Sequence, residues 1–196
     1  MKLSVFYDYT CPYCYLCSRN LDELSNEFDL HIEWKGIEIH PEYPKHGQKS
    51  SRSLRSMKAA ERIKETAKET GIGIILPGFR TNSRLSLEAS EFAKISGRFA
   101  EVHAALYEAY FLRKENIGDV KIVLNTCEKA GLDKTALEEC LNQRTMYHRI
   151  EENKKEASLN QILGVPTLII GELPVHGNQS IDTLRLMIKR AIERTA

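Results

Sequence analysis

The stretch Cys11-Pro12-Tyr13-Cys14 directly follows the apolar run of residues 3–9 and sets the architecture of this chain. The apolar run predicts a short buried strand. Pro12 suits the first position of a helix, where its missing N–H costs nothing. Two thiols separated by two residues at such a strand-to-helix junction can close a disulfide. The motif therefore predicts a thiol–disulfide redox site.

The two cysteines take different places on the predicted helix. Cys11 falls at the N-cap, where unpaired backbone N–H groups and the positive end of the helix dipole favour a thiolate. Cys14 lies one turn further along, on an apolar face with three-and-four spacing that runs through Cys14, Cys17, Leu21, Leu24 and Phe28. We therefore expect Cys11 to attack substrate disulfides and the buried Cys14 to resolve the mixed disulfide.

Three further cysteines have a plain interpretation as small buried side chains: Cys17, Cys127 and Cys140. A second redox pair of Cys127 and Cys140 is the alternative, if a helix hairpin brings them together. The Cys-x2-Cys-x2-Cys spacing also raises the question of a metal. An iron–sulfur cluster of this kind would need its fourth cysteine at Leu21, and a zinc site would need a distant fourth ligand. We therefore expect no metal site.

Composition limits the classes of function. The 196 residues, 42% of them hydrophobic, suffice for one domain or one domain with a large insertion. The 28 Lys and Arg nearly balance 27 Asp and Glu, which argues against a general nucleic-acid-binding surface. No apolar run approaches the roughly 18 residues of a membrane span, and Met1 leads into the first strand without room for a signal peptide. We expect a cytoplasmic protein without nucleic-acid or membrane partners, whose cysteines are catalytic or buried.

The order of predicted elements is β-α-β, then helices, then β-β-α. Residues 30–39 alternate as a second strand, and residues 40–53 have the Pro, Gly and Ser content of an exposed connection. Residues 54–163 are helical with breaks at glycines, and Asn82 is expected to cap one helix. Strands at 167–170 and 175–176 precede a last helix capped by Ser180. Residues 1–45 and 161–196 would form one α/β domain, and residues 46–160 a helical insertion.

This order, with a dithiol at the first helix start, resembles the thioredoxin-like fold of the DsbA family with its large all-helical insertion. The resemblance extends to the signal-less, FrnE-like branch of that family. It rests on segments spread along the chain: Asp8 with the Cys-Pro-Tyr-Cys motif, Thr81 to Ala89, His103 to Phe111, Asn116-Ile117-Gly118 and Gly164-Val165-Pro166-Thr167. The dithiol alone is moderately specific, and its combination with the last segment is much more so.

The resemblance implies a substrate-binding surface around the cysteines that comprises Pro12, Tyr13, Val165, Pro166 and Thr167. Pro166 would be cis and its loop would lie beside the Cys11 sulfur, so that an extended substrate peptide can pair briefly with the Val165 backbone. Pro-Tyr replaces the Pro-His of the family's periplasmic oxidants and resembles the dipeptide of glutaredoxins. Oxidant, isomerase and reductant therefore stay open, and a reducing compartment favours reduction or exchange.

Three function hypotheses follow. The first is a DsbA-like dithiol–disulfide oxidoreductase that acts on protein or small-molecule disulfides through a Cys11 mixed disulfide. It needs no cofactor beyond the redox-active pair, and glutathione is a candidate co-substrate. The second is a glutathione-dependent isomerase or transferase of the hydroxychromene-carboxylate isomerase or kappa-class type, enzymes that resemble this chain in fold but typically lack the second cysteine. The third is a peptide-binding, chaperone-like module. Monomer and homodimer are both open.

Several charged residues invite further hypotheses. Residues 45–68 hold eight Lys and Arg against two Glu. A solvated helix face is the ordinary interpretation, and an acidic partner or the carboxylates of glutathione is the alternative. Glu33 or Glu38 could accept a proton from Cys14, although both could equally face solvent. His103 is expected to be packed rather than a ligand.

Overall fold

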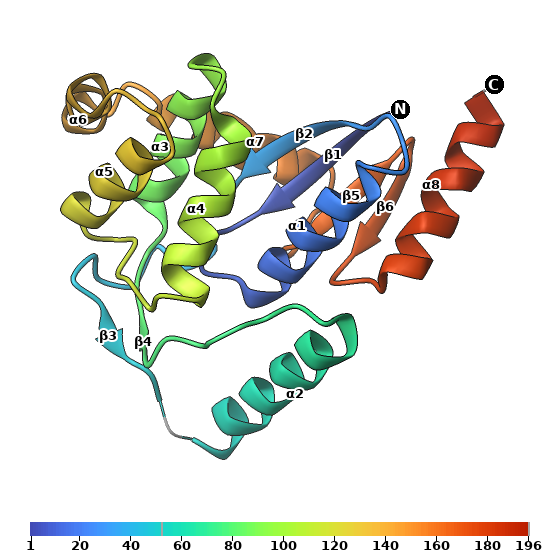
Figure 1. Cartoon of the computed structure of the whole chain (residues 1–196), viewed down its shortest axis with the longest axis horizontal. Coiled ribbons are helices and arrows are strands. Elements are labelled where there is room, and N and C mark those ends of the chain that lie inside the picture. Colours follow the sequence, from blue (N-terminus) through green and yellow to red (C-terminus); the bar gives the residue numbers. More distant parts are fainter. Residues whose placement is uncertain (52, 196) are drawn as a thin grey trace.

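The computed structural model describes residues 1–51 and 53–195, and a mixed four-stranded sheet forms its centre (Figure 1). The strand order is β2-β1-β5-β6. β1 pairs in parallel with β2 and antiparallel with β5, which pairs antiparallel with β6. The four strands are β1 (Lys2–Tyr7), β2 (His31–Gly36), β5 (Thr167–Ile170) and β6 (Leu173–His176). The chain thus has a thioredoxin-like α/β fold.

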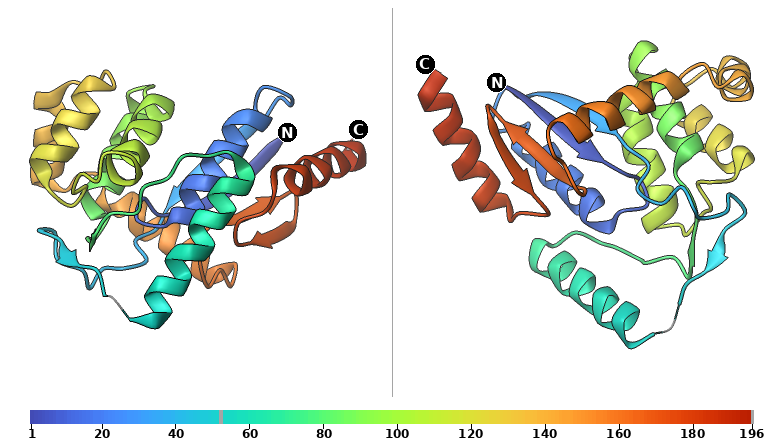
Figure 2. Two further views of the ribbon diagram at one scale, coloured as in Figure 1. Left: turned by 60° about the horizontal axis from the view of Figure 1, so that its bottom comes forward. Right: turned by 180° about the vertical axis from the view of Figure 1, so that it is seen from behind.

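Helices border the sheet, and a long helical insertion follows β2. α1 (Pro12–Leu24) and α8 (Ile181–Thr195) pack side by side, and α7 (Tyr147–Leu159) contacts β2. The other insertion helices are α2 (Leu54–Thr70), α3 (Arg84–Ile95), α4 (Phe99–Phe111), α5 (Val120–Lys129) and α6 (Lys134–Gln143). α3 to α6 gather beside the sheet, whereas α2 lies near the start of α1, which it contacts (Figure 2). A short ribbon of β3 (Gln48–Lys49) and β4 (Phe79–Arg80) joins α2 to the rest.

The alternation of β1 separates two apolar clusters. Leu3, Val5 and Tyr7 belong to the main core, together with the apolar face of α1. Phe6 points to the opposite face of the sheet, where it packs in a smaller cluster with Ile37, Ala157 and Ile162. β1 is therefore buried on both sides, which fixes the position of the segment that follows it.

The expected stripe on α1 is confirmed. Cys14, Cys17, Leu21 and Leu24 are almost completely inaccessible to solvent, and Phe28 packs against the core from just beyond the helix. This burial fixes the rotation of α1 about its axis. Cys11, at the start of the helix, is consequently held at the edge of the core.

The structure corrects three details of the sequence-based prediction. β2 ends at Gly36, and the N–H of Ile39 is bonded to the Asp8 carboxylate instead of continuing the ladder. Asn82 does not cap α3; its side-chain amide donates to the Tyr43 carbonyl oxygen at 2.8 Å. A break at residues 144–146 separates α6 from α7. There Arg144 adopts a left-handed conformation. Its guanidinium donates to the buried Glu88 carboxylate on α3, a tertiary contact that no local sequence signal reveals.

Ser180 does cap α8, because its hydroxyl oxygen accepts the N–H of Thr183 at 3.2 Å. The glycine breaks expected near residues 71, 97, 118 and 131 also coincide with helix ends. No helix in the described part of the chain is both long and apolar enough to cross a membrane.

Candidate active site

Cys11 is the N-cap of α1, as the position of Pro12 predicts. The Cys11 sulfur accepts the N–H of Cys14 at 3.4 Å. Pro12 occupies the first turn of the helix, where the N–H groups have no partner within the helix. The helix start therefore directs an N–H group and the positive end of its dipole at this sulfur.

The loop of residues 164–167 meets the same sulfur from the opposite side. The Val165–Pro166 peptide bond is cis, and the Cys11 thiol donates to the Val165 carbonyl oxygen at 3.5 Å. A shallow hollow of about 360 Å³ runs along this loop, and its lining includes Leu163, Val165, Pro166 and His176. Leu163 is 98% exposed there. The structure thus brings Cys11, Val165 and Pro166 together.

Cys14 and Cys17 continue from Cys11 into the core. Burial raises the pKa of the Cys14 thiol well above its usual value, and the neighbouring Cys11 adds to this rise. Burial likewise raises the pKa of Cys17 to about 12. Cys14 is only 1% exposed, against 6% for Cys11. Cys11 is therefore the more accessible sulfur of the pair, and burial of Cys14 favours its protonated form.

Asp8 fastens the loop between β1 and α1. It is completely buried, and one carboxylate oxygen accepts the N–H and the hydroxyl of Thr10 at 2.7 and 2.8 Å. The other oxygen accepts the N–H of Ile39 at 2.8 Å, and the Asp8 carbonyl oxygen accepts the N–H of Cys11 at 3.2 Å. Burial raises the pKa of this carboxyl, and the hydrogen bonds from Ile39 and Thr10 lower it in part. One side chain therefore ties the ends of two strands to the dithiol loop.

A cleft of about 380 Å³ lies on the insertion side of Cys11. Thr10 and Pro12 form the wall next to the dithiol, and α2 forms another wall with Met57 and Ile63. The remaining lining residues include His40, Tyr43, Arg80, Thr81 and Tyr110. Sequence analysis missed these residues as a group, because they come from the connection at 40–53, from β4 and from α4.

Three side chains tether the connection that lines this cleft. Asn82 donates to the Tyr43 carbonyl oxygen, and Asn116 donates to the Lys45 carbonyl oxygen, both at 2.8 Å. The Thr81 hydroxyl donates to the Pro44 carbonyl oxygen at 3.3 Å. Gly118 completes the contact, because a Cβ at this position would lie 2.2 Å from the Thr81 hydroxyl. Two of the segments that carry the family resemblance, Thr81 to Ala89 and Asn116-Ile117-Gly118, thus meet at this connection.

Neither predicted proton acceptor contacts Cys14 among the residues that the structure describes. Glu33 is about half exposed and pairs with Lys2 and Lys35 at 3.4 and 3.5 Å. Glu38 accepts from the Arg84 guanidinium at 2.9 and 3.1 Å. The buried carboxyl beside the motif is instead that of Asp8. Its spacing to Thr10 is the sequence signal that could have identified it, because an Asp side chain commonly accepts the backbone N–H two residues further on.

Buried aromatic side chains pack next to the dithiol loop, among them Tyr9, Trp34, His103 and Tyr107. The Tyr107 hydroxyl donates to the Asp8 carbonyl oxygen at 3.4 Å, and Tyr9 lies 3.0 Å from Nδ1 of His103. The His103 ring packs 4.4 Å from Trp34, between ring centroids. Burial lowers the pKa of His103 to about 3, and the positive charge of Lys94 adds to this. His103 is therefore a packed, neutral histidine, as predicted.

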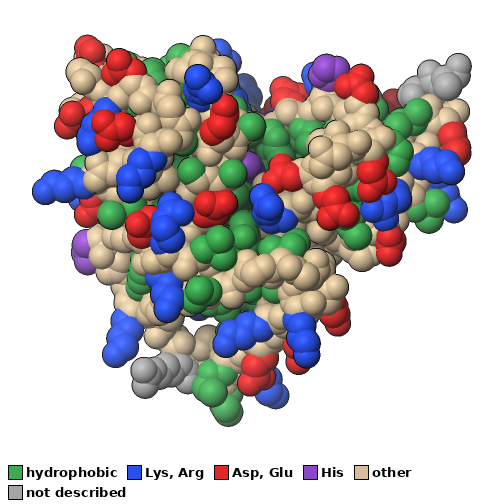
Figure 3. Space-filling model, in the orientation of Figure 1, with side chains coloured by type: hydrophobic (Ala, Val, Ile, Leu, Met, Phe, Trp, Pro, Cys, Tyr) green, Lys and Arg blue, Asp and Glu red, His purple; other side chains and the backbone are tan. Residues whose placement is uncertain are grey.

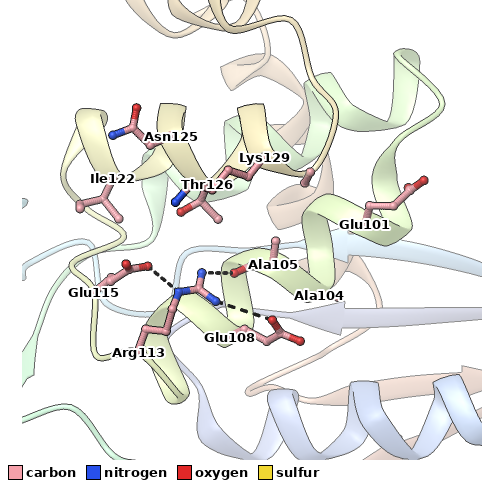
Figure 4. Close-up of a pocket in the computed structure, with 11 residues that line it drawn as sticks. Glu101, Ala104, Ala105, Glu108, Arg113, Glu115, Ile122, Asn125, Thr126 and Lys129 are labelled. Atoms are coloured by element: carbon pink, nitrogen blue, oxygen red, sulfur yellow. Dashed lines mark hydrogen bonds and ion pairs between the residues drawn. The ribbon is translucent and has the colours of Figure 1, made fainter.

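A larger hollow of about 550 Å³ lies between α4 and α5, away from the cysteines (Figure 4). Its arginine, Arg113, is already bound on three sides, by Glu115 at 3.0 Å, Glu108 at 3.6 Å and the Ala105 carbonyl oxygen at 3.3 Å. No cysteine lines it. Size alone therefore does not identify the functional site of this protein.

The remaining cysteines are free thiols in different surroundings. Burial raises the pKa of Cys127 to about 12, and Cys140 accepts the Thr145 hydroxyl at 3.0 Å. Within residues 1–51 and 53–195, no group of three or more His, Cys, Asp or Glu side chains could hold a metal ion. Cys11 and Cys14 are the two thiols that lie beside the Val165 carbonyl oxygen and the start of α1.

The comparisons with known proteins agree with this geometry. The family described as a DSBA-like thioredoxin domain matches residues 2–189, so the chain belongs to this family. The chain is 24% identical to the 2-hydroxychromene-2-carboxylate isomerase of Pseudomonas putida, over 100% of this chain and 98% of that protein.

Two solved structures are similar over almost the whole chain. A probable DsbA oxidoreductase of Streptomyces coelicolor has a TM-score of 0.88 at 17% identity, over 98% of this chain and 90% of its own. The cytosolic disulfide reductase DsbM of Pseudomonas aeruginosa, solved with GSH, has a TM-score of 0.71 at 19% identity, over 100% and 98% of the two chains. At these identities the likeness shows the fold alone. The protein thus has the fold of the DsbA-like thiol–disulfide oxidoreductases.

Proposed function

We propose that this protein is a dithiol–disulfide oxidoreductase that uses Cys11 and Cys14. The observation that carries the proposal is the position of the Cys11 sulfur, 3.4 Å from the Cys14 N–H and 3.5 Å from the Val165 carbonyl oxygen. The first contact places the reacting sulfur at the N-terminus of α1, among backbone N–H groups without a partner in the helix. The second lies where an extended substrate could pair its backbone with residues 164–167.

The reaction would proceed in two exchanges. The Cys11 thiolate attacks one sulfur of a substrate disulfide, the substrate S–S bond breaks, and the second substrate sulfur leaves as a thiolate that takes up a proton. Cys14 then loses its proton and attacks Cys11 in the mixed disulfide, which releases the first substrate sulfur and leaves a Cys11–Cys14 disulfide. Pro12, Tyr13, Val165, Pro166 and Thr167 would border the bound substrate.

We favour reduction or exchange as the direction, in the cytoplasm, with glutathione as a co-substrate. This rests on the similarity to a cytosolic disulfide reductase solved with GSH. In this scheme one glutathione attacks the Cys11–Cys14 disulfide, which forms a mixed disulfide on Cys11 and frees Cys14 as a thiol. A second glutathione then attacks this mixed disulfide, leaves as oxidised glutathione and restores the dithiol. The proposal divides the chain into an α/β domain of residues 1–45 and 161–196 and an insertion of residues 46–160.

Equilibrium titration of the dithiol in glutathione buffers, followed by mass-shift alkylation, tests the proposal. A reductant should have a potential near that of thioredoxin, about −270 mV. Cys14→Ser should accumulate a mixed disulfide on Cys11, whereas Cys17→Ser, the matched control one turn further along, should turn over normally. Failure of Cys11 and Cys14 to form a disulfide in any buffer would overturn the dithiol mechanism.

A glutathione-dependent isomerase is the second candidate, because the 2-hydroxychromene-2-carboxylate isomerase of Pseudomonas putida is similar over the whole chain. Such chemistry does not consume the second thiol. Full glutathione-dependent activity in Cys14→Ser would therefore favour the isomerase over the oxidoreductase.

A further inference from the structure

Residues 45–68 concentrate positive charge that the dithiol chemistry does not use. The segment contains eight of the chain's 28 Lys and Arg but two of its 27 Asp and Glu. The rest of the chain is net acidic, with 20 Lys and Arg against 25 Asp and Glu. The small net charge of +1 therefore conceals a basic segment attached to an acidic body.

The described cations of this segment are exposed and form no salt bridge. Seven of the eight lie in the described part of the chain and all seven are exposed: Lys45, Lys49, Arg55, Lys58, Arg62, Lys64 and Lys68. None of them takes part in a salt bridge among residues 1–51 and 53–195. Arg55, Lys58 and Arg62 follow one another at three- and four-residue spacing, so they share one helix face and repel each other. Such a surface raises the local positive potential.

The basic segment borders the cleft beside Cys11. α2 lies across the end of the molecule at which α1 begins (Figures 1 and 2). In the space-filling view its surface shows Lys and Arg side chains together with acidic ones (Figure 3). α2 contributes Ser56, Met57 and Ile63 to the wall of the cleft, opposite Thr10 and Pro12. An anion drawn to this segment would therefore be brought close to the dithiol.

Arg80 adds a cation inside the cleft itself. Its Nη1 donates to the Tyr43 hydroxyl at 2.6 Å, and the His40 ring packs 4.8 Å from the Tyr43 ring. Arg80 joins no salt bridge within the described residues. Arg84, four positions further along the chain, pairs with Glu38 instead. A guanidinium whose position is fixed by a neutral partner keeps further N–H donors for a carboxylate.

We propose that the preferred partners of Cys11 are polypeptide disulfides flanked by acidic residues, whose carboxylates meet Arg80 and the cations of residues 45–68. This inference rests on the proposed function, because it names the substrate class of the same dithiol. The exchange itself is unchanged: the Cys11–substrate S–S bond forms as the substrate S–S bond breaks, and the leaving sulfur departs as a thiolate. The charges accelerate encounter and orient the peptide in the cleft.

Two synthetic peptides test the inference. They have the same length and one internal disulfide, and differ only in carrying Glu or Lys residues on both sides of it. The reduced protein should react at least about tenfold faster with the acidic peptide at low ionic strength. The ratio of the two rate constants should fall towards one in 1 M salt, where the Debye length is about 3 Å.

The two proposals fail in different ways in this experiment. If neither peptide oxidises Cys11 and Cys14, the proposed oxidoreductase function is wrong. If both peptides react with equal rate constants, or if their ratio does not respond to salt, the oxidoreductase stands and the preference for acidic partners is overturned.

Charge-reversal variants locate the effect. The double variant Lys58→Glu with Arg62→Glu should lower the acidic-to-basic ratio at least about threefold, and Arg80→Gln should slow the acidic peptide more than the basic one. Lys121→Glu with Lys189→Glu changes the net charge equally, at two exposed positions on α5 and α8, and should leave the ratio intact. An equal fall in this control would assign the preference to net charge and overturn the proposed surface. The salt series on the unmodified protein decides if a variant does not fold.

Discussion

α1 and α2 both border the cleft beside Cys11, yet they are attached to the molecule in opposite ways. Eight of the thirteen residues of α1 are buried, and its first turn is bonded to the Asp8 loop. α2 is longer, with seventeen residues, but buries only Ile63 and Ala67. Cys11 and Cys14 thus lie at the start of a helix that is buried along most of its length, whereas α2 buries only two of its residues.

This difference suits α1 to holding the cysteines in place and α2 to attracting a partner. Interactions that position a thiol within a fraction of an ångström need a rigid support, and the core beneath α1 supplies it. A surface that attracts an anion by its field needs charge more than fixed contacts. Changes in the α1 region should therefore affect stability and reactivity together, and changes in α2 should affect partner choice and local opening.

The largest effect is expected from Asp8→Ala. The substitution leaves the part-buried N–H groups of Thr10 and Ile39 without their acceptor. At about 1 to 3 kcal/mol for each group, the unfolding free energy should fall by roughly 2 to 6 kcal/mol. Urea unfolding followed by Trp34 fluorescence measures the stability, and alkylation measures the reactivity of Cys11. The exposed Asp29→Ala is the control. Unchanged stability would show that the carboxylate does not hold the loop.

Gly118→Ala should act on the wall between the two regions. The new Cβ would lie 2.2 Å from the Thr81 hydroxyl and 2.7 Å from the Lys45 carbonyl oxygen, and overpacking of this kind costs about 1 to 3 kcal/mol. Thermal unfolding and the rate of disulfide exchange should both worsen. Gly78→Ala is the matched control, because nothing lies within 4 Å of a Cβ at that position. Equal behaviour of the two variants would contradict the tether.

His103, which is buried on α4, should make the unfolding free energy sensitive to acid. The pKa of His103 is lowered by burial to about 3 in the folded protein, whereas in the unfolded chain it is about 6.5. Its contribution to stability is therefore present above pH 6.5 and is lost as the pH falls. Between pH 7 and pH 5, the unfolded chain gains about 2 kcal/mol relative to the folded protein.

The measurement compares unfolding free energies of the unmodified protein and His103→Phe at several pH values. The unfolding free energy of the unmodified protein, taken relative to that of His103→Phe, should fall by about 2 kcal/mol between pH 7 and pH 5. His46→Gln, at an exposed position, is the control. Parallel pH curves for the unmodified protein and His103→Phe would mean that His103 titrates alike in both states.

The same division explains how far the sequence could predict the molecule. Local signals were sufficient for α1, because the N-cap position of Cys11, Pro12 and the apolar stripe all lie within one short segment. The cleft residues Tyr43 and Arg80 carry no local signal, since they meet only through the tether of an irregular connection. The burial of Asp8 likewise depends on Ile39, which reaches it only after β2 has paired with β1.

The smallest effect should come from the helix caps. Their loss compares local opening of α2 with unfolding of the core most directly. The Ser53 hydroxyl oxygen accepts the Ser56 N–H at 3.2 Å at the start of α2, as Ser180 does for Thr183 at the start of α8. Each change to Ala should cost about 1 kcal/mol. In Ser53→Ala the loss should appear as faster hydrogen exchange confined to α2, because this helix can open without disrupting the core. In Ser180→Ala it should lower the global unfolding free energy, since α8 packs on α1 and β5. A global loss in Ser53→Ala would show that α2 unfolds only together with the core.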